Sequence, residues 1–96
     1  MNKIINEQNF LEGFWELNPI TQKIKEKYEK EFEKLKSLKD KNINDTIDIT
    51  ILIVYFFNKE HAELLNELFL ILEKAKNYIS KNVKDSYENI IKEIWL

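Results

Sequence analysis

With 96 residues, the chain is long enough for one domain with one core, and an apolar content of 44% is enough to fill it. It contains no cysteine, which excludes disulfide bonds and thiolate metal sites and suits a reducing compartment, so we expect a cytoplasmic protein. The formal net charge is −2 and every basic residue is Lys, which argues against sequence-specific binding of nucleic acid, because Arg supplies many bidentate base contacts.

The first residues indicate a short helix followed by an aromatic turn. Residues 2–8 place Ile4 and Ile5 on one side, and no secretory signal is expected because no apolar stretch of the required kind is present. The only glycine, Gly13, then stands among three large aromatic side chains. Glycine tolerates positive φ and close backbone approach, so we predict that residues 10–17 turn and fold their large apolar groups onto the core.

The clearest helix start follows at Asn18 and Pro19, because Asn is a good N-cap and proline suits the first helical position. Apolar residues then recur at steps of three and four, which predicts one amphipathic helix ending near Lys39. This stripe consists of Ile20, Ile24, Tyr28, Phe32, Leu35 and Leu38. From Lys23 to Lys41, eight Lys stand against five acids, a net of +3. The interleaved acids favour a solvated helix face over an RNA-contacting one.

The next segment carries conflicting signals. Polar and apolar residues alternate from position 45 to 51, and Ile49 to Phe57 is β-branched and aromatic, which favours a strand. No second segment offers a pairing strand, and an unpaired strand leaves its backbone groups unsatisfied. We therefore predict a helix that begins at Asp45 and is buried on nearly all sides from Ile49 on. The alternative is a strand at 47–57 that pairs with another chain.

Two further helices complete the chain. The first is expected from about Lys59 to Lys81, with an apolar surface broad enough to touch several neighbours or to receive a partner. The second is expected from Asp85, with Glu88 as the reciprocal capping residue. The segments together predict an all-α fold, a small bundle of four to five helices in a single interaction domain (residues 1–96), with the Gly13 turn packed on the core.

No pattern in the sequence points to catalysis, a cofactor or a metal. His61 is the only histidine and lacks the spaced Glu or His partner of a helical metal site, so we expect an exposed residue in a first helical turn. Ser37, Ser80 and Ser86 lie near predicted helix ends, where capping explains them, and no glycine-rich loop is present. The longest uncharged apolar run, residues 49–57, is far shorter than the ~20 residues of a membrane span, so no membrane association is expected.

The segment from Gln8 to Asn18, QNFLEGFWELN, resembles a known motif. It is similar to the glutamine, acidic-glycine, tryptophan, x-leucine pattern that opens the C-terminal domain of two related groups. These are the vault poly(ADP-ribose) polymerase and proteins that join a VIT domain to a von Willebrand factor A domain. Farther along, residues 72–79, LEKAKNYI, are similar to that family's pattern of Glu, x, x, Ala, x, x, Trp or Tyr. The positions involved are Gly13, Phe14, Trp15, Leu17, Ala75 and Tyr78, and Glu12 stands where the family usually has Asp.

The resemblance implies a helical domain that associates with the major vault protein, the shell subunit of vault ribonucleoprotein particles. The chain would then be a non-catalytic docking module, usable as a packaging tag, whose motif specifies the fold rather than the binding surface. Trp15 is expected to plug the core rather than anchor an interface, whereas Trp95 is equally compatible with a core contact and an exposed anchor. The alternative is an unrelated helical adaptor or homo-oligomerisation domain that associates through residues 49–57.

Overall fold

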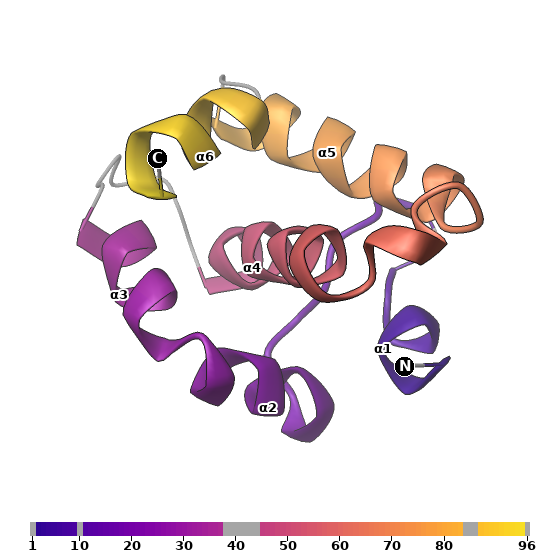
Figure 1. Ribbon diagram of the computed structural model, residues 1–96, viewed down its shortest axis with the longest axis horizontal. Coiled ribbons are helices and arrows are strands. Elements are labelled where there is room, and N and C mark those ends of the chain that lie inside the picture. Colours follow the sequence, from indigo (N-terminus) through magenta and orange to yellow (C-terminus); the bar gives the residue numbers. More distant parts are fainter. Residues whose placement is uncertain (1, 10, 38–44, 84–86, 96) are drawn as a thin grey trace.

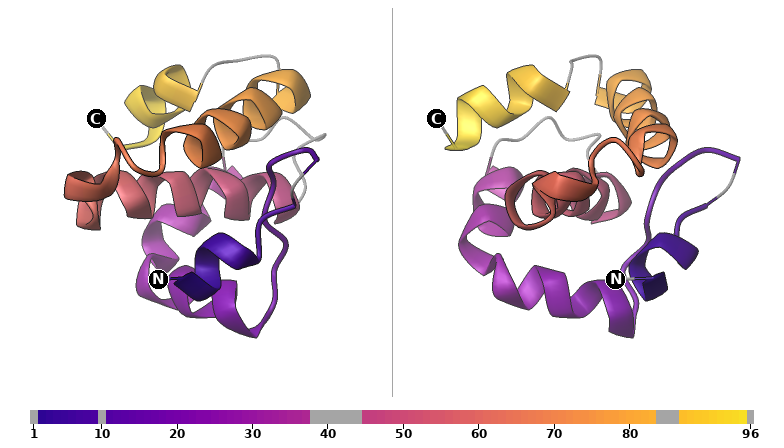
Figure 2. Two further views of the ribbon diagram at one scale, coloured as in Figure 1. Left: turned by 90° about the vertical axis from the view of Figure 1, so that its right-hand side faces the viewer. Right: turned by 45° about the vertical axis from the view of Figure 1, so that its right-hand side comes forward.

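The computed structural model describes residues 2–9, 11–37, 45–83 and 87–95, which form six α-helices and one 3₁₀ helix and contain no β-strand. The elements are α1 (Asn2–Asn6), α2 (Pro19–Lys27), α3 (Glu29–Ser37), α4 (Asp45–Glu60), η1 (Ala62–Leu64), α5 (Phe69–Val83) and α6 (Tyr87–Trp95). They wrap around α4 in a body of 31 × 25 × 24 Å (Figure 1 and Figure 2). The expected all-α bundle is confirmed, with one more α-helix than the largest number expected.

Helix α4 lies at the centre of the bundle. Figure 1 shows α5 and α6 on one side of it and α2 and α3 on the other. All side chains from Ile49 to Val54 are 0% exposed, as is that of Phe57. The helix prediction is therefore confirmed and the strand alternative is wrong. Burying one such side chain gains about 1.5–3 kcal/mol, whereas an unfavourable helix propensity costs at most about 0.7 kcal/mol per residue. The side chains of the two expected caps, Asp45 and Asp85, lie outside the described residues.

The start of α2 follows the sequence prediction. The Asn18 side chain accepts hydrogen bonds from the backbone N–H groups of Ile20 and Thr21, at 2.9 and 3.0 Å. The Thr21 hydroxyl in turn accepts from the backbone N–H of Asn18 at 2.9 Å and donates to the carbonyl of Glu16. Pro19 occupies the first helical position, where its missing N–H costs nothing. These bonds fix the point at which the extended segment becomes a helix.

The single helix expected from Pro19 to Lys39 is wrong, because the chain bends at Tyr28 into α2 and α3. Tyr28 has φ −115° and ψ 41°, outside the helical region. The hydrogen-bond ladder nevertheless continues through the bend, from Tyr28 N–H to Ile24 and from Phe32 N–H to Tyr28, at 3.0 and 2.9 Å. A straight helix would meet α4 only near one crossing point, whereas the bend packs both halves against it (Figure 1). The stripe residues Ile24, Tyr28, Phe32 and Leu35 are all buried as a result.

The helix expected from Lys59 begins only at Phe69. Helix α4 continues through Lys59 to Glu60, and the Asn58 side chain donates to the Val54 carbonyl at 2.9 Å within its last turns. The chain then changes direction through η1 and the turn at 65–68. Leu68 is buried there, while Phe69 and Leu70 are exposed. This turn contains no glycine or proline, so the helical periodicity of the sequence predicted a continuous helix across it.

Tyr28 also joins the bend to the end of α4. Its hydroxyl donates a hydrogen bond to the carboxylate of Glu60, which forms an ion pair with Lys27 at 2.6 Å. Burial, followed by the hydrogen bond to Glu60 and its negative charge, raises the pKa of Tyr28 well above its usual range. The hydrogen bonds from Lys27 and then from Tyr28 lower the pKa of Glu60. The neutral phenol and the ionised carboxylate therefore stabilise the same contact.

We expect the free energy of unfolding to fall as the pH rises above about 10, where an exposed tyrosine begins to ionise. The unfolded chain then releases the Tyr28 proton while the folded chain retains it; below that pH the contribution is fully present. Tyr28→Phe should reduce this alkaline loss, measured by urea denaturation as a function of pH. Tyr78→Phe should reduce it less, because burial raises the pKa of Tyr78 without a contribution from a carboxylate hydrogen bond. Equal pH profiles for wild type and Tyr28→Phe would contradict the expectation.

Candidate functional site

The turn that holds the only glycine is shaped by Asn9. Its side-chain oxygen accepts hydrogen bonds from the backbone N–H groups of Leu11 and Glu12, at 3.0 and 2.9 Å. The Asn9 carbonyl accepts from Gly13 N–H, and the Asn9 N–H donates to the carbonyl of Phe14, both at 2.8 Å. Gly13 has φ 91°, a backbone conformation that glycine adopts readily and other residues rarely adopt. The predicted turn is therefore confirmed, and it is held closed by its own hydrogen bonds.

This turn lies directly against the backbone of α5. A Cβ atom placed on Gly13 would be 2.6 Å from the carbonyl oxygen of Lys74, a distance that real Cβ contacts do not show. The side-chain amide of Gln8 donates to the carbonyl of Gly13 at 2.8 Å and to that of Ile71 at 3.0 Å. One side chain thus ties the turn both to itself and to α5, so glycine is required here for its missing side chain as well as for its φ.

The two sequence patterns behind the family resemblance meet at this contact. Gly13 and Phe14 come from the first pattern, and Ala75 and Tyr78 come from the second, on α5. The rings of Phe14 and Tyr78 have centroids 5.1 Å apart, and Ala75 is fully buried. The structure therefore places the first pattern against α5, the helix that carries the second, and brings the rings of Phe14 and Tyr78 together.

Trp15 lies in the core beside this contact. It is 0% exposed, its indole N–H donates to the carbonyl of Ile4 at 2.7 Å, and its ring centroid is 6.3 Å from that of Phe57. Its backbone N–H donates to the buried hydroxyl of Thr50 at 2.9 Å. That hydroxyl in turn donates to the backbone carbonyl of Thr46 at 2.7 Å. The side chain is placed as the expected core plug. Sequence reasoning missed Thr50, because a threonine within an apolar run carries no signal of its role as an acceptor.

Leu17, Trp95 and His61 are the other residues that the sequence analysis singled out. Leu17 is 41% exposed and lies outside the buried core. Trp95 ends α6, and its side chain lies outside the described part of the chain. His61 is half-buried rather than exposed, because the chain folds back into η1 after α4 and sets its ring 5.1 Å from that of Phe56. The expectation of an exposed His61 is therefore wrong.

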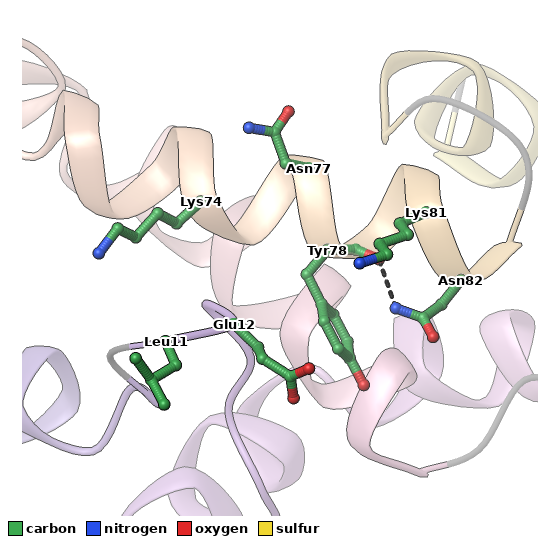
Figure 3. A pocket seen from close by; sticks show the side chains of 7 residues that line it. All are labelled: Leu11, Glu12, Lys74, Asn77, Tyr78, Lys81 and Asn82. Atoms are coloured by element: carbon green, nitrogen blue, oxygen red, sulfur yellow. Dashed lines mark hydrogen bonds between the residues drawn. The ribbon is translucent and has the colours of Figure 1, made fainter.

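A pocket of about 410 Å³ opens beside the turn, between residues 11–12 and the outer side of α5 (Figure 3). It is lined by Leu11, Glu12, Lys74, Asn77, Tyr78, Lys81 and Asn82. In Figure 3 the Glu12 carboxylate points toward the Tyr78 ring, Lys81 extends toward Tyr78, Lys74 extends away from it, and Asn77 points away from the turn. Burial, and to a smaller extent the charges of Glu12 and Glu16, raise the pKa of Tyr78. The Tyr78 hydroxyl is therefore a neutral hydrogen-bonding group at the pocket.

Leu11 lines this pocket, and Leu70 lies farther toward the start of α5; both leucines are exposed. Leu11 is 92% exposed at the tip of the turn, and Leu70, one helical turn before Lys74, is 75% exposed. We call the surface formed by these leucines and the pocket's central residues the α5–turn surface. It comprises Leu11, Glu12, Leu70, Lys74, Tyr78 and Lys81. Sequence reasoning expected Leu11 to fold onto the core, and it left the broad apolar surface that includes Leu70 open to several neighbours or to a partner. Residue 70 lies about 200° around the helix from buried Leu72.

The comparisons with known proteins add no relative. No family model, curated protein or solved structure was found to match the chain. Within the described ranges, no three His, Asp or Glu side chains group closely enough to hold a metal ion. The described helices also include none with the length and apolar character needed to cross a membrane. The features that remain as a candidate site are therefore the motif contact and the α5–turn surface.

Proposed function

We propose that the chain is a non-catalytic protein–protein interaction module that docks on the major vault protein. What supports the proposal is the contact between Gly13 and the backbone of α5, with Phe14 on Tyr78 beside it. These residues belong to the two segments that resemble the vault-associated family, which lie far apart in the sequence. In the folded chain the first pattern lies against the helix that carries the second.

Three of the motif residues are nevertheless unsuited to bind a partner themselves. Trp15 and Ala75 are fully buried, and Gly13 is covered by α5. Their role in this proposal is to hold the fold, so the docking contacts come from exposed residues around them. A fused protein would be carried to the particle by the same contacts, which makes the chain usable as a packaging tag.

Self-association through the apolar run of α4 is disfavoured as an alternative. Ile49 to Val54 and Phe57 are enclosed by other elements of the same chain. A homo-oligomer of this fold would have to use a different surface. Light scattering on the purified chain tests this alternative directly.

Co-sedimentation with assembled shells of the major vault protein tests the proposed partner. We expect the chain to pellet with the shells at a fixed ratio in roughly 150 mM salt, where distant surface charges are screened. The chain centrifuged alone is the control for self-pelleting, and circular dichroism verifies that the sample is folded. A folded chain that remains in the supernatant with saturating shells would remove the vault partner from the proposal.

A further inference from the structure

We infer that the outer side of residues 63–73 is a docking face for a basic amphipathic helix of a partner protein. We call it the η1–α5 face, and it comprises Glu63, Asn66, Glu67, Phe69, Leu70 and Glu73. The inference rests on the proposed function only in taking the chain to be an interaction module; it does not depend on the partner being the major vault protein. Three observations carry it: the shared side of these residues, two exposed apolar side chains and the negative charge around them.

The η1–α5 face is the outer side of a segment whose inner side is anchored in the core. Helical hydrogen bonds continue across the turn, from Leu68 N–H to Leu64 and from Leu72 N–H to Leu68, at 2.9 and 3.0 Å. Leu68 and Leu72 are buried. At about 100° per residue, Asn66 and Leu70 fall nearly opposite Leu68, with the other members of the face around them. A partner therefore meets a surface that needs little ordering on binding, which preserves more of the contact energy as affinity.

Phe69 and Leu70 supply an apolar contact on this face. Their side chains are 58% and 75% exposed, although Leu68 and Leu72 beside them are buried. They lie about 100° apart around the helix, which is the width of the apolar stripe through which an amphipathic helix contacts a neighbour. Aromatic side chains are enriched at protein interfaces, so an exposed phenylalanine fits a surface that a partner covers.

The charge around these two side chains selects a basic partner. Residues 60–73 contain four glutamates and no lysine. Glu60 is paired with Lys27. Glu67 and Glu73, in contrast, form neither an ion pair nor a hydrogen bond within the part of the chain that the structure describes. Their charges are therefore available to a partner.

The neighbouring lysines do not cancel this charge. Lys59 lies over the rings of Tyr28 and Tyr55, with its Nζ 5.8 and 5.5 Å from their centroids. Lys74 follows Glu73 directly, and the three glutamates of the face against this one lysine leave a net of −2. Figure 1 shows η1 and the start of α5 at the end of the bundle opposite α3, so the lysines of α3 are distant. A helix with basic residues beside its apolar stripe complements both features.

The same charge argues against other occupants of the face. Nucleic acid and an anionic lipid surface would be repelled. An isologous contact with a second copy would bring the carboxylates of both copies to the same interface, which disfavours a homodimer here. Other hollows of the molecule lack this preference. Glu12 and Lys81 both line the pocket beside the Gly13 turn, and Glu7 and Lys23 both line a groove of about 680 Å³ between α1, α2 and the end of α4.

The test is a titration of the whole chain, labelled with nitrogen-15, followed by amide chemical shifts. The probe is a capped synthetic helix of about four turns, with leucines along one side and lysines flanking them. One control peptide has glutamate at each lysine position. A second control has the composition of the probe in an order that forms no apolar side. We expect the probe to shift the amides of Glu67, Phe69 and Leu70, and both controls to leave them unchanged.

Single substitutions locate the contact. Phe69→Ala and Glu67→Lys should each weaken binding of the probe by roughly tenfold, because the first removes an apolar anchor and the second brings like charges together. Leu11→Ala and Glu33→Lys are the matched controls and should retain wild-type affinity, since they change an exposed leucine and an exposed glutamate elsewhere. All four side chains are exposed, so the variants should fold, and circular dichroism verifies this.

Several outcomes would overturn the inference. These are shifts centred on the α5–turn surface or on the 680 Å³ groove, equal binding of the probe and either control peptide, wild-type affinity in Phe69→Ala or Glu67→Lys, or no shift at millimolar probe. A free chain that is dimeric and becomes monomeric with Leu70→Asp would identify a second copy as the occupant instead. Probe binding at this face without sedimentation on vault shells would retain the face and remove only the vault partner. Sedimentation without probe binding would do the reverse.

Discussion

Replacing Trp15 by alanine should lower the free energy of unfolding by about 3–5 kcal/mol. The indole fills the space between the Gly13 turn and α4, contacts the ring of Phe57, and satisfies the Ile4 carbonyl with its N–H. Small domains are stabilised by only about 5–15 kcal/mol in total, so much of the variant could be unfolded at 37 °C. Urea denaturation followed by circular dichroism at 222 nm measures the change.

Leu17→Ala is the matched control for Trp15→Ala, since Leu17 belongs to the same motif but is 41% exposed. It should alter the free energy of unfolding by no more than about 0.5 kcal/mol. A Trp15→Ala midpoint equal to that of wild type would show that the indole does not fill the core. A large loss in Leu17→Ala would show that the motif leucine has a packing role in the folded chain.

Replacing Gly13 by alanine should cost about 2–5 kcal/mol, because two effects act together. A φ of 91° strains any residue with a Cβ, and that Cβ would lie 2.6 Å from the Lys74 carbonyl oxygen. The carbonyl belongs to the backbone of α5, so it cannot move aside as a flexible side chain can. The measurement is the same urea denaturation, with exposed Glu12→Ala in the same turn as the control.

Gly13→Asn separates the two effects at this position. Asparagine tolerates positive φ better than alanine, but it brings the same Cβ toward Lys74. If close approach dominates, Gly13→Asn should be nearly as unstable as Gly13→Ala. A stable asparagine variant together with an unstable alanine variant would attribute the requirement for glycine to φ alone. Two stable variants would contradict the close contact itself.

Local signals predicted the parts of the fold that depend on neighbours in sequence. Asn18 and Pro19 marked the start of α2 correctly, because capping and proline geometry act within one helical turn. Periodicity identified the face that carries Ile24, Phe32 and Leu35, since burial of one side is what produces that spacing. It could not locate the bend at Tyr28, which results from packing of both halves on α4.

The candidate site was only partly visible in the sequence. Gly13 indicated a turn, but no residue near it in the sequence indicated that the turn packs against α5. Hydrophobicity assigned Leu11 to the core, although it is exposed, because residue type reports what a side chain prefers rather than where the fold leaves it. Lys74 and Lys81 line a pocket with residues 11–12, and the sequence contains no signal that brings these two segments together.

The central position of α4 also bears on aggregation. From Ile49 to Phe57 the chain has no charge, no glycine and no proline, and it is rich in β-branched and aromatic residues. Such a segment favours intermolecular cross-β pairing when it is exposed in an unfolded chain. In the native bundle its backbone is committed to helical hydrogen bonds, and its side chains are covered by elements from both ends of the sequence. The fold therefore sequesters the chain's most aggregation-prone segment, and a substitution that loosens the Gly13 turn removes part of that protection.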